Sequence, residues 1–146
     1  MKKTFYWVIG FVIAIQLIRP DFHNSAVDET VTLKTDPKVI GILNRSCYDC
    51  HSQETTYPWY NNIAPISWVM ANHIDQGRKA LDFSNWANID PAIKRERLER
   101  AKQVIYNYRM PKSEYIMMHE NARLSAEEKQ RLEQFFDEEI KKLDPL

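Results

Sequence analysis

The distribution of hydrophobic residues divides the chain into an apolar first segment and a longer part with helical periodicity. Residues 5–18 are apolar apart from Gly10 and Gln16, and two lysines precede them. As a helix, these 14 residues rise about 21 Å, less than the roughly 30 Å of a bilayer's hydrocarbon core. No clean pair of small residues marks a cleavage site after them, so the pattern predicts a signal-anchor or signal peptide over residues 1–20.

The rest of the chain is predicted to be a tether followed by one all-α domain. Residues 21–35 lack a helical period, which predicts a tether that lifts the domain off a membrane. Residues 36–146 contain Asp36 and Asp90 as helix caps, each followed by proline, and Ser125 as the start of a capping box. These signals and the apolar spacing predict helices over about 37–46, 65–79, 91–107 and 126–142.

Four further details of the domain are also predicted. We expect Gly41 to allow close packing of the first helix against another helix. In the third helix, Ile93 should face the core while the charged run 94–97 faces solvent. Residues 112–123 are expected to form an extended loop, and the apolar stripe of the last helix should pack on the first helix.

Composition limits the classes of partner. The chain has 20 basic and 20 acidic residues and a formal net charge of zero, so bulk electrostatics gives no basis for nucleic-acid binding. Its 44% hydrophobic content argues against a disordered chain. We therefore expect one modest folded domain that recognises its partners locally.

The candidate chemistry lies in the run Cys47-Tyr48-Asp49-Cys50-His51, a C-x-x-C-H motif. Two thiols three positions apart fall on one side of a helical turn, where both can add across the two vinyl groups of one porphyrin. His51 follows directly, so its imidazole can approach the iron from the proximal face. The motif therefore predicts one covalently attached haem c at Cys47 and Cys50, with His51 as an iron ligand.

Two other interpretations of the cysteines have less support. A structural zinc site normally needs two more thiolates or well-spaced histidines, but the chain has two cysteines in all and no such second pair. A redox dithiol usually follows a strand in a βαβ unit, and no such pattern is evident.

The ligand on the other face of the iron has several candidates, which are Met110, Met117, Met118, His119 and His73. Met110 precedes a proline that stiffens the loop and stands shortly before the last helix. We expect Met110 to be the distal ligand, with His119 as the alternative and an open coordination site as a further one. His73, within the second helix, is interpreted as a histidine whose hydrogen bonds are satisfied or which supports an iron ligand; approach to the iron or to a haem propionate is the alternative.

A family resemblance becomes specific at this point. The order C-x-x-C-H, Met-Pro and Leu-Ser-x-Glu-Glu before a last helix resembles class I c-type cytochromes. More narrowly, the chain resembles the bacterial haem-binding-domain family of exported, cytochrome-c-like proteins, through Cys47 to Ser52, Tyr57 to Tyr60, Ile63 to Pro65, Trp68, Asn72-His73, Gly77-Arg78, Met110-Pro111, Tyr115, His119 and Ala122 to Ser125. The resemblance implies a cytochrome-c-like helical domain around one haem c, with Met110 at the matching distal position.

These features predict a non-enzymatic electron-transfer module with His/Met-ligated iron and a redox protein as its partner. Haem c is attached outside the bacterial cytoplasm, so we expect the domain in the periplasm or cell envelope, anchored to the inner membrane by the N-terminal segment. A small peroxidase-like enzyme, using His73 or His119 as acid or base, is the alternative. A haem-based sensor is a third possibility.

Overall fold

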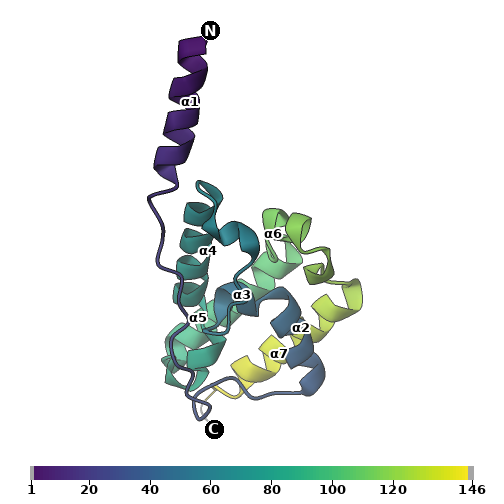
Figure 1. The fold of residues 1–146 in the computed structure, drawn as a ribbon. Helices are drawn as coiled ribbons and strands as arrows, with labels where there is room; N and C mark the ends of the chain where they lie inside the picture. The colour runs from purple at the N-terminus through teal and green to yellow at the C-terminus, as the bar shows by residue number, and fades with distance from the viewer. Residues whose placement is uncertain (1, 145–146) are drawn as a thin grey trace.

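A computed structural model describes residues 2–144 (Figure 1). Within these residues the fold is all-helical and contains no strand, which confirms the all-α part of the predicted fold. The elements in chain order are α1 (Lys2–Ile15), α2 (Pro37–Ser46), α3 (Tyr48–His51), η1 (Trp59–Asn62), α4 (Ile66–Ala80), η2 (Phe83–Asn88), α5 (Pro91–Tyr106), α6 (Ser113–Met118), η3 (Glu120–Ala122) and α7 (Ala126–Lys141).

The main helices begin where their capping residues predict. The Asp36 carboxylate accepts a hydrogen bond from the Lys38 backbone N–H at 2.8 Å, and Asp90 caps α5 in the same way. At α7 the capping box is complete, because the Ser125 hydroxyl accepts from the Glu128 N–H and the Glu128 carboxylate accepts from the Ser125 N–H. The four predicted helices correspond to α2, α4, α5 and α7 with closely matching ends.

The core joins helices that are far apart in sequence. α7 packs on both α5 and α2, as expected for the last and first helices of the domain. Leu43, Leu98, Leu132 and Phe136 are fully buried between them. Each buried side chain of this size contributes about 1.5–3 kcal/mol relative to an exposed one. This packing fixes α2, and with it the start of the C-x-x-C-H turn that follows.

Three details differ from the sequence-based expectations. Residues 112–123 contain α6 and η3 and are not an extended loop. Gly41 lies on the exposed side of α2, where an added Cβ would have nothing within 4 Å, so its predicted packing role is wrong. In α5 the inward face is displaced by one position: Ile93 is 46% exposed, while Lys94 is buried with its amine 4.8 Å from the Trp86 ring centroid.

Residues 21–35 contain no helix, but they run along the domain (Figure 1). From the base of α1, this dark blue segment passes α4 and reaches the opposite end of the molecule. There the Leu33 N–H donates to the Phe83 carbonyl at 2.9 Å, the Ala87 N–H donates to the Val31 carbonyl at 2.9 Å, and Leu33 is buried. Because it follows the domain surface, this segment does not act as a spacer between α1 and the domain.

Helix α1 projects away from the rest of the fold and has no buried residue (Figure 1). Among the described residues, no helix combines the length and apolar character that crossing a membrane requires.

Candidate haem site

The C-x-x-C-H motif forms a tight turn directly after α2. The Cys47 N–H still donates to the Leu43 carbonyl of α2, while the Cys47 carbonyl accepts from the N–H groups of Cys50 and His51 at 3.1 and 2.9 Å. Cys47 is the N-cap residue of this turn, α3, and Cys50 lies within it; both are free thiols and partly buried. The sequence expectation that the motif occupies a single helical turn is therefore met.

His51 is oriented by a backbone carbonyl. Its Nδ1 lies 2.9 Å from the Leu81 carbonyl oxygen, which can only accept, so Nδ1 carries the hydrogen and Nε2 keeps its lone pair. Burial lowers the pKa of His51, so the imidazole is neutral at neutral pH. A neutral imidazole whose other nitrogen donates to a carbonyl is the usual form of a metal-ligating histidine.

Both thiols are held in the protonated form. Burial, followed by the charge of Cys50, raises the pKa of Cys47 to about 12. Burial, followed by the charge of Asp49, raises the pKa of Cys50 to about 11. Reactive redox dithiols have lowered thiol pKa values, so these environments do not fit a redox-active pair.

The motif lies directly against α4 at Gly77. A Cβ added at Gly77 would be 2.3 Å from the Cys50 carbonyl oxygen and 2.9 Å from its carbonyl carbon. Only a residue without a side chain permits this contact of helix and turn. The sequence contained Gly77 near the end of the second predicted helix, but nothing in the sequence indicated which segment it would touch.

Arg78, the next residue of α4, holds the chain that leaves the motif. Its guanidinium donates to the Ser52 carbonyl at 2.8 Å, to the Thr55 hydroxyl at 3.0 Å and to the Asn24 side-chain oxygen at 2.9 Å. One cation thus joins α4, the loop after His51 and the N-terminal segment. A guanidinium presents several donors in a fixed plane, which suits such a junction.

A cluster of aromatic and polar side chains flanks the motif next to Cys50. The Tyr115 hydroxyl donates to the Asp49 carboxylate at 2.6 Å, and the Tyr60 hydroxyl lies 2.6 Å from His119 Nε2. The Tyr115 and His119 rings stack with their centroids 4.5 Å apart. These bonds connect the motif to η1 and α6, and they engage the ring nitrogen of the alternative distal ligand, His119.

The methionine candidates differ in their environments. Met110 is partly buried and packs against the core cluster that Cys47 also contacts. Met117 and Met118 are 80% and 55% exposed on α6. His73 is partly buried on α4, where burial and then the charge of Lys112 lower its pKa.

No group of three or more His, Cys, Asp or Glu side chains within residues 2–144 is placed to hold a metal ion. A zinc site made only of protein ligands, the alternative interpretation of the two cysteines, therefore has no complete donor set in the described part of the chain. One imidazole beside two thiols instead matches a cofactor whose iron already has equatorial ligands. A porphyrin supplies such ligands through its four nitrogens.

An all-helical domain built around such a turn defines the molecule as a haem-binding protein. The model of the haem-binding domain family matches residues 10–138, and the chain belongs to this family. No curated protein matches the chain significantly. No solved structure does so either.

Proposed function

We propose that the protein is a non-enzymatic electron-transfer module that carries one haem c, attached through Cys47 and Cys50. The observation that carries this proposal is the bond between His51 Nδ1 and the Leu81 carbonyl, which leaves a neutral Nε2 free as a proximal ligand. Haem in such a site supplies one-electron exchange at its iron. The family membership supports haem binding itself.

We propose Met110 as the distal ligand because its surroundings suit a buried thioether. It is partly buried against the core cluster, whereas Met117 is 80% exposed on α6. His119, the alternative ligand, has its Nε2 engaged with the Tyr60 hydroxyl. A neutral sulfur opposite a neutral imidazole favours the ferrous state, since that state has less charge to bury.

We also propose that the protein is attached to the bacterial inner membrane with its haem domain on the periplasmic side. The support is the composition and exposure of α1, whose apolar side chains are without contacts to the domain: Phe5, Trp7 and Phe11 are 62%, 80% and 66% exposed. Helices of this kind are stable when lipid covers them.

A peroxidase-like enzyme is the second candidate function. It is favoured by the pairing of Tyr60 and His119, which could hold and transfer a proton beside the haem site. In that case Met110 would not occupy the distal position, and the ferric protein would react with peroxide.

Expression with a haem-maturation system and matched single variants tests the proposal. The unmodified protein should keep its haem in acid acetone and show the weak far-red band of methionine ligation in the ferric state. Met110→Ala should abolish this band and lower the reduction potential, while the control Met117→Ala and the variant His119→Ala should retain both. Loss of low-spin ligation in His119→Ala, with Met110→Ala unchanged, would refute the assignment of Met110. Haem that acid acetone extracts freely would refute covalent attachment.

A further inference from the structure

The base of α1 is bound to the domain through hydrogen bonds. The Gln16 side chain accepts from the Ala64 N–H at 2.9 Å and donates to the Ala64 carbonyl at 3.2 Å. Two residues further, the Ile18 carbonyl accepts from the Trp68 indole N–H at 2.8 Å. These three bonds fix the end of α1 at the start of α4, so the domain cannot hang freely from α1.

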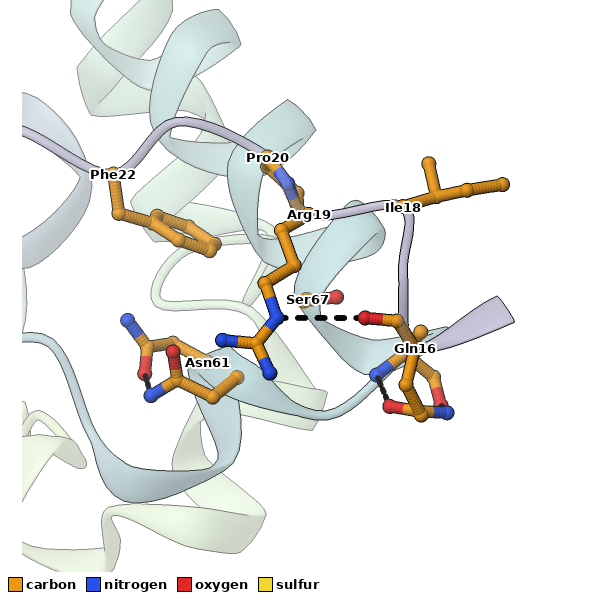
Figure 2. A pocket seen from close by; sticks show the side chains of 9 residues that line it. Gln16, Ile18, Arg19, Pro20, Phe22, Asn61 and Ser67 are labelled. Carbon is orange, nitrogen blue, oxygen red and sulfur yellow. Dashed lines mark hydrogen bonds between the residues drawn. The ribbon is translucent and has the colours of Figure 1, made fainter. Parts of the chain in front are cut away.

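A small hollow lies inside this junction (Figure 2). The Arg19 guanidinium points into it, and Arg19 Nε donates to the Gln16 carbonyl at 3.4 Å. Its volume is about 40 Å³, and Asn61 and Ser67 form its domain side. A hollow of this size holds water and no larger ligand, so it belongs to the junction and is not a binding site of its own.

The domain surface beside this junction is apolar and exposed. Its members are large side chains just after α1, in and just after η1, and at the start of α4: Leu17 is 83%, Ile18 64%, Trp59 74%, Ile63 40% and Ile66 48% exposed. We call these five residues the α1-proximal surface. Leu17 and Ile18 directly follow Gln16, and the other three residues lie within five positions of Ala64, to which Gln16 is hydrogen-bonded. Scattered apolar residues are ordinary on protein surfaces, but a group at the base of an apolar helix indicates a common environment.

We propose that the α1-proximal surface docks on the lipid bilayer and inserts its side chains into the interface. This inference rests on the proposed membrane attachment through α1. We expect lipid to cover the α1-proximal surface because this surface continues directly from α1. The exposed apolar side chains of α1 are themselves covered by lipid in the proposed membrane attachment.

The length of α1 supports the same conclusion. Its 14 residues rise about 21 Å, roughly 9 Å less than a typical hydrocarbon core. A short apolar helix is accommodated when the bilayer thins or when flanking residues are drawn towards the lipid. Here the flanking residues are the α1-proximal surface, since Gln16 holds the domain at the helix end. Trp59, which is 74% exposed, is of a residue type that anchors proteins at the membrane interface.

Docking would set the position of the haem site relative to the membrane. Gly77, which touches Cys50, is 11 residues after Ile66 on α4. This separation corresponds to about 16 Å along the helix axis. The C-x-x-C-H turn would then be held near the bilayer, within reach of a redox partner embedded in the same membrane.

Lipid photo-crosslinking tests the proposal with the full chain carrying its haem. The protein is reconstituted in vesicles of phosphatidylcholine and phosphatidylglycerol that contain a phosphatidylcholine with a diazirine-bearing acyl chain. Labelled peptides are then mapped by mass spectrometry. We expect label in α1 and, several-fold above the peptide containing Ile93, in the peptide containing Trp59, Ile63 and Ile66. Ile93 is the internal control because it is 46% exposed and lies in the first turn of α5, outside the α1-proximal surface.

Two variants make the result specific. The triple variant Trp59→Ser, Ile63→Ser, Ile66→Ser should lose the domain label and keep the α1 label. Gln16→Leu should likewise lower the domain label several-fold, because it removes both bonds to Ala64. Label in α1 with no excess in the domain peptide over Ile93 overturns docking but leaves membrane attachment standing. Absence of label in α1 overturns membrane attachment, and docking with it.

Discussion

Replacing Gly77 with alanine would test the contact on which the haem site is built. The added methyl carbon would lie 2.3 Å from the Cys50 carbonyl oxygen, 2.9 Å from the carbonyl carbon and 3.1 Å from Cys50 Cβ. Ordinary contacts of this kind begin at 3.4 Å. The turn and α4 must therefore separate by about 1 Å, and no side-chain rotation can relieve a clash with backbone atoms.

The magnitude follows from two opposing effects. Overpacking a tightly fitted contact costs about 1–3 kcal/mol, and a backbone clash belongs at the upper end of that range. Alanine is favoured over glycine in a helix interior by about 1 kcal/mol, which offsets part of the loss. We therefore expect Gly77→Ala to lower the free energy of unfolding by about 1–2 kcal/mol and to reduce the yield of attached haem.

Gly41→Ala is the matched control. Gly41 is also in a helix interior, but nothing lies within 4 Å of its added Cβ. The same substitution should therefore raise the free energy of unfolding by about 0.5–1 kcal/mol. Urea unfolding in detergent, followed by far-UV circular dichroism, should give midpoints that move in opposite directions at an unchanged slope.

The reasoning would be refuted if both alanine variants were stabilised to a similar degree. That result would mean that α3 and α4 are not in contact at Gly77. If the slope of the urea unfolding curve changes for Gly77→Ala alone, the test is decided by the sign of the shift in the urea midpoint and by the haem content per chain.

Two further predictions concern polar contacts. The Ser125 N–H donates a hydrogen bond to the Glu128 carboxylate and so lowers the pKa of Glu128 below its ordinary 4.5. The ionised carboxylate therefore contributes its full stabilisation above pH 4.5, and this contribution is lost as the pH falls through the folded-state pKa. Glu128→Gln should therefore be less stable than the unmodified chain by about 0.5–1 kcal/mol at pH 7, and the difference in thermal midpoint should vanish in acid; a difference that persists at low pH would contradict this reasoning. Tyr115→Phe removes the bond to Asp49 and should lower the free energy of unfolding by about 1–2 kcal/mol, measured by urea titration beside the exposed control Tyr106→Phe, whose urea midpoint should stay where it is.

Local signals in the sequence predicted most of the helices. Asp36, Asp90 and Ser125 each cap a helix through their own side chains, and each of these contacts lies within four consecutive residues. Ile93 and Lys94 were misassigned because an amphipathic pattern in a helix rich in charge does not fix which neighbouring position faces inward. The aromatic ring of Trp86, which accommodates the Lys94 amine, comes from a different element and leaves no local signal.

The candidate site also has one part that the sequence predicts and another that only the fold reveals. Cys47, Cys50 and His51 lie within five residues of sequence, so the motif alone was enough to predict them as candidate haem-binding residues. The groups that orient them were not, because the Leu81 carbonyl, Gly77 and Tyr115 come from 26 to 64 residues beyond His51. A backbone carbonyl in particular has no residue type to recognise, so only the fold could reveal that Leu81 fixes the tautomer of His51.

Helix α4 connects the two ends of the molecule that matter for the proposed function. Its first turn binds the end of α1 through Trp68, and its last turn contacts the motif through Gly77 and holds the exit loop through Arg78. Because a helix changes length little without breaking its hydrogen bonds, α4 holds these two contacts at a fixed separation. The N-terminal segment runs along this helix from Ile18, beside Trp68, to Asn24, where Arg78 binds it. The haem site is therefore positioned by α4, and the residues that appeared to be a spacer instead brace that helix.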